Sequence, residues 1–241
     1  MLTPVKRILV TGASSPLGRA ISLHFASPSI ELGLHFHQGK DQAFNLASEI
    51  EEKGGHATTL QADLSVESEC EALVKSWLPP ESTLDILINN AGHYPPNFLS
   101  NMSAEDWHVG IASTATATFL ITRATLPFIR KTSQGRIINI GDSSCDRIGS
   151  RNQALGYHTG KTGVLMLTKS FAQQEAKHGI TVNMISPGYL ENSVELPELE
   201  TIPARRFGTF EDVTHTIDFL IQPESGYCNG SNLILSGGWN I

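Results

Sequence analysis

Short apolar runs alternate with longer amphipathic segments along the whole chain, and this alternation constrains the fold more than any other feature. The expected strands, rich in β-branched residues and leucine, are 7–10, 31–36, 57–62, 84–89, 135–140, 180–185 and 232–235. The segments with helical spacing of apolar residues are 17–27, 40–54, 66–78, 104–131, 157–178 and 210–221. Such alternation predicts an α/β fold, a parallel sheet with helices on both faces, whose ligands bind at the carboxyl ends of the strands.

Length and composition narrow the protein class. The 241 residues suit a single domain over 1–241, and 40% hydrophobic with 17% charged residues predicts a packed core. The net charge of −7 argues against a nucleic-acid partner. No apolar run looks long enough for a membrane span, and the N-terminal run is too short for a signal peptide. The histidines form no metal-ligand spacing, so no metal is predicted. Three cysteines without paired spacing favour a reducing, cytoplasmic compartment: Cys70, Cys145 and Cys228.

A glycine-rich turn follows the first expected strand. In ILVTGASSPLGRAI, Gly12 and Gly18 lie between strand and helix, where glycine lets the backbone turn tightly and approach a pyrophosphate. The N–H groups of the helix N-terminus then face the anion. Pro16 replaces the usual middle glycine and removes one N–H, so the turn departs from the common form. Its place in the first strand–helix unit favours nucleotide binding over a merely structural turn.

The end of the second expected strand bears on the choice of dinucleotide. A carboxylate there binds the ribose hydroxyls of NAD and repels the extra phosphate of NADP. In LHFHQGKD the only acid, Asp41, falls later, on the following helix. The positions before it carry His37, Gln38 and Lys40, and the glycine turn adds the hydroxyls of Ser14 and Ser15. Lys40 is either a phosphate partner or a solvated helix-start lysine. NADP(H) is therefore favoured, with NAD(H) as the alternative.

An ordered set of short motifs resembles the short-chain dehydrogenase/reductase family over essentially the whole chain. The matching pieces are TGASSPLG (11–18), QADLS (61–65), NNAG (89–92), YHTGK (157–161), VNMISPG (182–188) and GG (237–238). The resemblance implies a Rossmann-type, doubly wound sheet of seven strands and a small-molecule oxidoreductase that forms a homodimer or homotetramer. Small residues on 101–131 and 157–178, such as Ala115 and Gly163, would permit the helix packing. The cofactor-binding residues that it implies are Gly12, Ser14, Ser15, Leu17, Gly18, His37, Gln38, Lys40, Asp63, Leu64, Asn90, Ala91, Gly92, Tyr157, Lys161, Pro187, Gly188 and Asn192.

Tyr157 and Lys161 are expected to be the catalytic pair. By resemblance, Tyr157 is the acid and Lys161 its partner, and their spacing of four puts both on one face of a helix. A phenol has a pKa near 10, and we expect a nearby ammonium to lower it. The phenol would then donate a proton to the substrate atom that gains charge as hydride arrives. The alternative is a tyrosine and a lysine at chance helical spacing.

The family's catalytic serine has two candidate positions here. Counting forward from the strand 135–140 gives Asp142, and counting back from Tyr157 gives Ser144. We favour Asp142, because the strand fixes the start of the loop, although an aspartate is also a common turn residue. A carboxyl group could relay a proton or accept an N–H of a nitrogen heterocycle. Pteridine reductases carry aspartate there, and the LHFHQ and HYPP (93–96) segments add to this likeness, with Tyr94 available to stack on a flat ring.

Other features leave the detailed function open. Thr114 is a candidate catalytic residue: it stands where the family has an asparagine that holds a water for proton supply, and threonine can still hydrogen-bond but is shorter. Residues 189–209 form an expected substrate loop that begins at Tyr189, a candidate substrate contact. The first interpretation is an NADPH-dependent reductase of a carbonyl or imine, of pteridine type. One alternative is a 3-oxoacyl-carrier-protein reductase, with Ser144 as the hydroxyl and the basic residues Arg147, Arg151, Arg205 and Arg206 near the entrance. Another is an NADP(H) sensor without turnover.

Overall fold

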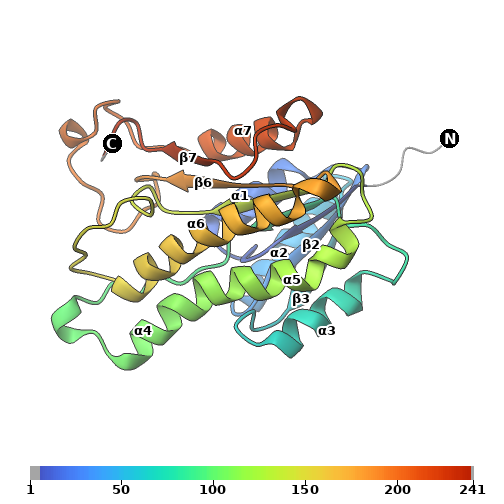
Figure 1. Cartoon of the computed structure of the whole chain (residues 1–241), viewed down its shortest axis with the longest axis horizontal. Coiled ribbons are helices and arrows are strands. Elements are labelled where there is room, and N and C mark those ends of the chain that lie inside the picture. Colours follow the sequence, from blue (N-terminus) through green and yellow to red (C-terminus); the bar gives the residue numbers. More distant parts are fainter. Residues whose placement is uncertain (1–5, 240–241) are drawn as a thin grey trace.

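All seven expected strands form, and they pair in parallel within one sheet of order β3-β2-β1-β4-β5-β6-β7 (Figure 1). The computed structural model describes residues 6–239. The strands are β1 (Lys6–Val10), β2 (Ile30–Phe36), β3 (His56–Gln61), β4 (Ile86–Asn89), β5 (Arg136–Ile140), β6 (Thr181–Pro187) and β7 (Asn232–Leu235). Every residue of the central strands β4 and β5 is buried, as expected for parallel strands covered on both faces. The predicted α/β, doubly wound Rossmann-type fold is confirmed.

Helices cover both faces of this sheet. They are α1 (Pro16–His24), α2 (Lys40–Glu52), α3 (Glu67–Trp77), α4 (Ala104–Ile111), α5 (Ala117–Ile129), α6 (Leu155–Glu175) and α7 (Phe210–Ile221). One core cluster joins α3, α5 and α6 to the sheet, and the other joins α1, α2 and α7 to the opposite face. In Figure 1, α6 lies alongside the long α4–α5 segment, and α7 lies beyond β6 and β7.

Local sequence signals set several of the helix ends. Pro16 begins α1, where its missing N–H costs nothing, and Ser15 caps the helix by accepting from the Gly18 N–H. Capping boxes begin α4 at Ser103 and α7 at Thr209. These caps explain why the expected and observed helix starts agree so closely.

The expected helix 104–131 forms with an interruption. Between α4 and α5 the backbone makes one turn of π-helix, η2 (Ala112–Thr116). Short 3-10 turns occur at η1 (Leu99–Asn101), η3 (Ala176–His178), η4 (Leu199–Thr201) and η5 (Pro223–Ser225). A π-turn inside a helix frequently marks a functional site, and here it carries Thr114.

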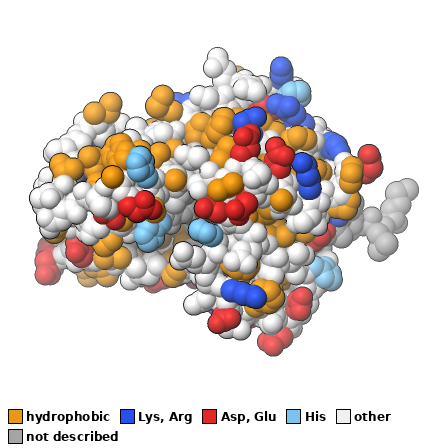
Figure 2. Space-filling view, turned by 90° about the horizontal axis from the view of Figure 1, so that it is seen from below, with side chains coloured by type: hydrophobic (Ala, Val, Ile, Leu, Met, Phe, Trp, Pro, Cys, Tyr) orange, Lys and Arg blue, Asp and Glu red, His pale blue; other side chains and the backbone are white. Residues whose placement is uncertain are grey.

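One helix contradicts the expectation that no segment could span a membrane. By length and composition alone, the segment Ala104–Ile129 is long and apolar enough to cross a membrane. However, the side chains of Ala117, Ile121, Leu126 and Ile129 belong to the core cluster. The segment is therefore explained as a core helix of this fold. On the face seen in Figure 2, acidic and basic side chains are interspersed and form no continuous basic patch.

Candidate active site

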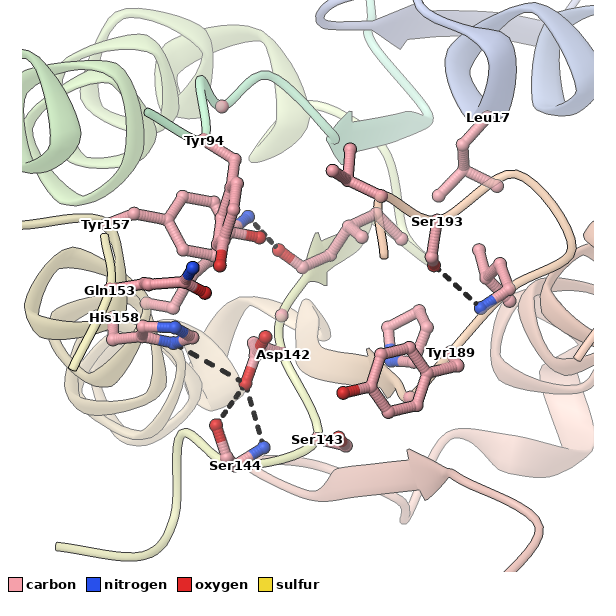
Figure 3. A pocket seen from close by; sticks show the side chains of 18 of the residues that line it. Leu17, Tyr94, Asp142, Ser143, Ser144, Gln153, Tyr157, His158, Tyr189 and Ser193 are labelled. Atoms are coloured by element: carbon pink, nitrogen blue, oxygen red, sulfur yellow. Dashed lines mark hydrogen bonds and ion pairs between the residues drawn. The ribbon is translucent and has the colours of Figure 1, made fainter. Parts of the chain in front are cut away.

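A cavity of about 870 Å³ lies at the carboxyl ends of the strands. The loops that follow β1, β4, β5 and β6 all contribute to its wall, together with the start of α6 (Figure 3). The predicted site residues that line it are Ser15, Leu17, Asn90, Gly92, Tyr94, Asp142, Ser144, Tyr157, Lys161, Pro187, Gly188, Tyr189 and Asn192. The other predicted residues do not line this cavity: Gly12, Ser14, Gly18, His37, Gln38, Lys40, Asp63, Leu64, Ala91 and Thr114.

The glycine turn at one end of the cavity is held very tightly. A Cβ on Gly18 would lie 2.2 Å from the carbonyl oxygen of Gly12, and Gly12 itself has a φ of +64°. The Asn90 amide, at the end of β4, donates to the oxygens of Thr11, Gly12 and Ser15. Only glycine fits at position 18, because any side chain would collide with backbone.

A buried histidine that the sequence analysis did not single out braces the same turn. His35 on β2 is 2% exposed, and its Nδ1 accepts from the Gly12 N–H at 3.1 Å. This leaves Nε2 to donate to the carbonyl oxygen of Ala62 at 3.1 Å. Burial lowers the pKa of His35 to about 4, so the ring is neutral at physiological pH. The neutral ring therefore links the ends of β1, β2 and β3.

The predicted phosphate-selecting residues gather beyond this turn. The Ser14 hydroxyl donates to the carbonyl oxygen of Gln38 at 3.1 Å, which joins the glycine turn to the end of β2. Helix α2 then begins at Lys40 with Gly39 as its N-cap, and no side chain caps this N-terminus. Lys40 is exposed, with its Nζ 5.6 Å from the centre of the Phe44 ring.

Two of the predicted adenine-side residues have local structural contacts. The Asp63 carboxylate accepts from the N–H and the hydroxyl of Ser65, at 2.9 and 2.7 Å. Leu64 is buried in the core cluster under α3. Asp63 therefore also closes a turn, and Leu64 also packs the core.

Tyr157 and Lys161 lie together on the first turns of α6. Lys161 is 3% exposed, its Nζ donates to the carbonyl oxygen of Ile140 at 2.7 Å, and it lies 5.5 Å from the centre of the Tyr157 ring. Tyr94 packs edge-on against Tyr157, with ring centres 5.1 Å apart. On the far side of the cavity, Tyr189 makes a similar contact with Trp239 at 4.7 Å. The cavity thus has aromatic walls on two sides.

The expected acidification of Tyr157 is wrong in this structure. Burial raises the pKa of Tyr157, and the nearby Asp142 carboxylate raises it further. Burial also lowers the pKa of Lys161 to about 8, although Asp142 acts in the opposite direction. The reason is that burial strips water from the phenolate and the Asp142 carboxylate repels it. The phenol is accordingly protonated at neutral pH, which is the form that can donate a proton.

The structure places both Asp142 and Ser144 at the cavity, but in different roles. Asp142 Oδ1 accepts from the Ser144 N–H at 2.9 Å and also from the Ser144 hydroxyl (Figure 3). The Ser144 hydroxyl therefore donates to the Asp142 carboxylate and holds that carboxylate in position. The Nδ1 of His158 lies 3.9 Å from the same Asp142 oxygen.

Thr114 lies behind the catalytic pair and outside the cavity. Its side chain is fully buried, and its hydroxyl donates to the carbonyl oxygen of Gly110 at 2.6 Å. A Cβ on Gly160 would lie 1.8 Å from that hydroxyl oxygen, so the small residue brings α6 against the π-turn within one chain. Gly163 similarly faces Ala115 of the same chain.

Several cavity residues were missed by the sequence analysis. They are Phe98, Gln153, His158, Ser193 and Trp239. His158 could have been noticed, because it lies inside the YHTGK motif beside Tyr157. No sequence motif pointed to Trp239, which reaches the cavity from the loop after β7. Within residues 6–239, no three histidine, cysteine or acidic side chains form a metal-like group.

The chain is similar to known proteins over nearly all of its length. Residues 6–200 match the family described as short chain dehydrogenase. It is 36% identical over 236 residues to the 3-oxoacyl-[acyl-carrier-protein] reductase of Synechocystis sp., covering 95% of each chain. It is 33% identical over 241 residues to 3-oxoacyl-[acyl-carrier-protein] reductase FabG of Staphylococcus aureus, covering 97% of each.

Solved structures share the fold. One, described as a short-chain alcohol dehydrogenase from Sinorhizobium meliloti 1021, superposes with a TM-score of 0.88 at 25% identity and covers 98% of this chain and 97% of its own. The gluconate 5-dehydrogenase of Burkholderia cenocepacia J2315, in complex with NADP and tartrate, gives a TM-score of 0.87 at 24% identity and covers 98% and 95%.

Proposed function

The chain belongs to the short-chain dehydrogenase family, and from that premise we propose that it is an NADP(H)-dependent reductase of a carbonyl or imine. The observation that carries the proposal is one cavity that joins the tight glycine turn to Tyr157, Lys161 and Asp142. In the bound state, the reduced nicotinamide would supply the hydride. The same cavity holds a protonated phenol ready to neutralise the charge that develops on the substrate.

The residues present suit a dinucleotide. The tight turn at Gly12 and Gly18 leads into the start of α1, where Ser15 and Leu17 line the cavity. The uncapped N-terminus of α2, with Lys40 and the Ser14 hydroxyl beside it, supports a preference for the extra phosphate of NADP over NAD. Pro187, Gly188 and Asn192 would border the nicotinamide, and Asp63, Leu64 and Ala91 the adenosine half.

Each residue near the reacting atoms has a role that its surroundings support. Lys161 would hold the nicotinamide ribose and compensate the phenolate that forms on Tyr157 as its proton leaves. Asp142 would contact the substrate, since Ser144 fixes its carboxylate at the cavity wall. Tyr94 and Tyr189 would enclose a flat substrate from two sides.

Two substrate classes are candidates, and a different observation favours each. The names of the similar curated proteins favour a 3-oxoacyl thioester. The carboxylate of Asp142 between aromatic walls favours a flat nitrogen heterocycle such as a pteridine, because a carboxyl group can exchange hydrogen bonds with ring N–H groups. Two arginines proposed for a carrier-protein surface have other partners: Arg206 pairs with Asp212, and Arg151 donates to backbone carbonyls.

The oligomeric state and the cellular compartment that we propose are those expected for a member of this family. We propose a homodimer or homotetramer, and exposed apolar side chains on α5 and α6, Phe119 and Met166, support contact through these helices. The three free cysteines support a reducing compartment such as the cytoplasm.

The test compares NADPH oxidation with acetoacetyl-CoA and with 7,8-dihydrobiopterin. Wild-type protein should turn over at least one of them, and Tyr157→Phe should lower kcat by roughly 100-fold or more while NADPH still binds. NADPH binding, read from nicotinamide fluorescence, is the control for folding. Undiminished turnover in Tyr157→Phe would contradict the mechanism. Tight NADPH binding without turnover of either compound would favour the sensor alternative.

A further inference from the structure

Each turnover under the proposed function leaves Tyr157 as a phenolate, which must regain a proton from water. Two of its neighbours are closed to solvent. Lys161 is 3% exposed and already donates to the Ile140 carbonyl oxygen. Thr114 is fully buried, and its hydroxyl hydrogen is given to Gly110. The phenol also lines the cavity, and Asp142 and His158 line the same cavity.

At this cavity wall, His158 lies beside Asp142, and both side chains are partly exposed. Its ring packs edge-on against Tyr157 and Tyr94, with ring centres 5.5 and 6.0 Å away. Its Nδ1 lies 3.9 Å from Asp142 Oδ1, and the two side chains are 19% and 24% exposed. Figure 3 shows the His158 ring directed at the Asp142 carboxylate, which Ser144 holds from below. A histidine and a carboxylate that can each carry a proton thus lie side by side at the cavity wall, next to Tyr157.

We propose that His158 is a positioning residue that returns protons to the active site through Asp142. The inference rests on the proposed function. The Tyr157 O–H bond breaks and its proton joins the substrate oxygen or nitrogen, which leaves a phenolate near the Asp142 carboxylate. His158 in its imidazolium form then gives its Nδ1 proton to the Asp142 carboxylate, directly after a small ring movement or through a water, and Asp142 passes this proton to the phenolate through a cavity water. His158 regains its proton from bulk water, so one solvent proton is consumed for each hydride transferred.

The surroundings of His158 set the pH range of this step. The titratable groups that face the ring are Asp142 from the loop after β5, Arg151 from the same loop, Tyr94 from the loop after β4 and Tyr157 from its own helix. Burial lowers the pKa of His158 below 6.5, Arg151 lowers it further, and Asp142 opposes both. The imidazolium fraction therefore falls as pH rises through a value below 6.5, and proton return should slow over that range.

The first experiment measures kcat against pH for wild-type protein and His158→Gln, with whichever of acetoacetyl-CoA and 7,8-dihydrobiopterin is reduced. Glutamine keeps a polar side chain but carries no exchangeable acid proton in this range. We expect kcat to fall about tenfold, the fall of kcat with rising pH to disappear, and added imidazole buffer to restore much of the rate. His215→Gln, an exposed histidine on α7, is the matched control and should behave as wild type. A lower kcat with an unchanged pH profile and no imidazole effect would mean a packing role only.

A second experiment needs no turnover. The ring of His158 is titrated by NMR in wild-type protein and in Asp142→Asn. The pKa of His158 should fall in the variant, because the carboxylate that favours the imidazolium is gone. An unchanged titration would overturn the relay even if Tyr157→Phe behaves as proposed. Failure of Tyr157→Phe to lose activity would instead overturn the proposed function.

Discussion

The two ends of the cavity are built differently. At the cofactor end, backbone meets backbone: a Cβ at Gly18 has no room, and Asn90 and His35 hold the turn through main-chain groups. At the catalytic end, side chains meet side chains, and Asp142, Tyr157 and His158 come together from a loop and a helix. Backbone shape controls the first end, whereas charge and protonation control the second.

This difference predicts which properties a substitution at each end should change. A change at the cofactor end should disturb folding and dinucleotide binding together, because the same atoms serve both. A change at Asp142 or His158 should alter rate and pH dependence with little effect on folding, because both side chains are partly exposed.

The largest expected effect comes from Gly18→Ala. The new methyl would meet the Gly12 carbonyl oxygen at 2.2 Å, so the turn must open, at a cost of about 3 kcal/mol or more. Thermal unfolding and NADPH binding should both weaken. Gly149→Ala is the control, because its nearest contact, the end of the Arg151 side chain at 3.4 Å, can move away. Wild-type stability and binding in Gly18→Ala would refute the backbone account of this end.

His35 gives the cofactor end a pH dependence that can be separated from catalysis. Its folded-state pKa of about 4 lies below the ordinary 6.5, so the unfolded chain binds more protons between these values. The contribution of His35 to the free energy of unfolding is therefore fully present above about pH 6.5. It is lost as pH falls, and the loss reaches about 3 kcal/mol near pH 4.

His35→Asn should lose this contribution to the slope of unfolding free energy against pH, as measured by urea denaturation from pH 4 to 7. His56→Asn, at an exposed histidine on β3, should keep the slope. Equal slopes in wild-type protein and His35→Asn would show that His35 does not link the three strands as described.

At the catalytic end, Asp142→Asn should lower kcat/KM by about 10- to 100-fold, because the amide can neither carry nor return a proton. Ser144→Ala removes one of the two hydrogen bonds that hold the carboxylate and should cost only a few-fold. Both variants should unfold at temperatures close to that of wild type. The reverse order of effects would identify Ser144 as the reacting hydroxyl.

The smallest effect is expected at Ala154, which precedes α6 with φ +47° although it is not glycine. Ala154→Gly should release left-handed strain of about 1–2 kcal/mol, partly offset by greater freedom of the unfolded chain. We expect a net stabilisation of about 0.5–1 kcal/mol in urea denaturation. Destabilisation would show that the Ala154 methyl, which is fully buried, contributes more packing than strain.

The sequence by itself determined the sheet, the helices on both faces, the glycine turn and the Tyr157–Lys161 pair. The sheet, the helices and the turn follow from apolar periodicity and turn residues, which are local properties of the chain. The pair was indicated by the resemblance of the ordered motifs, with the spacing of four placing both side chains on one helix face.

Only the tertiary structure decided the direction of the pKa shift of Tyr157 and the bracing of the glycine turn by His35. Each depends on groups distant in sequence: Asp142 and Tyr157 are fifteen positions apart, and His35 on β2 reaches Gly12 at the end of the neighbouring strand β1. Burial and the Asp142 carboxylate raise the pKa of the phenol, and both effects arise only when the fold brings distant segments together.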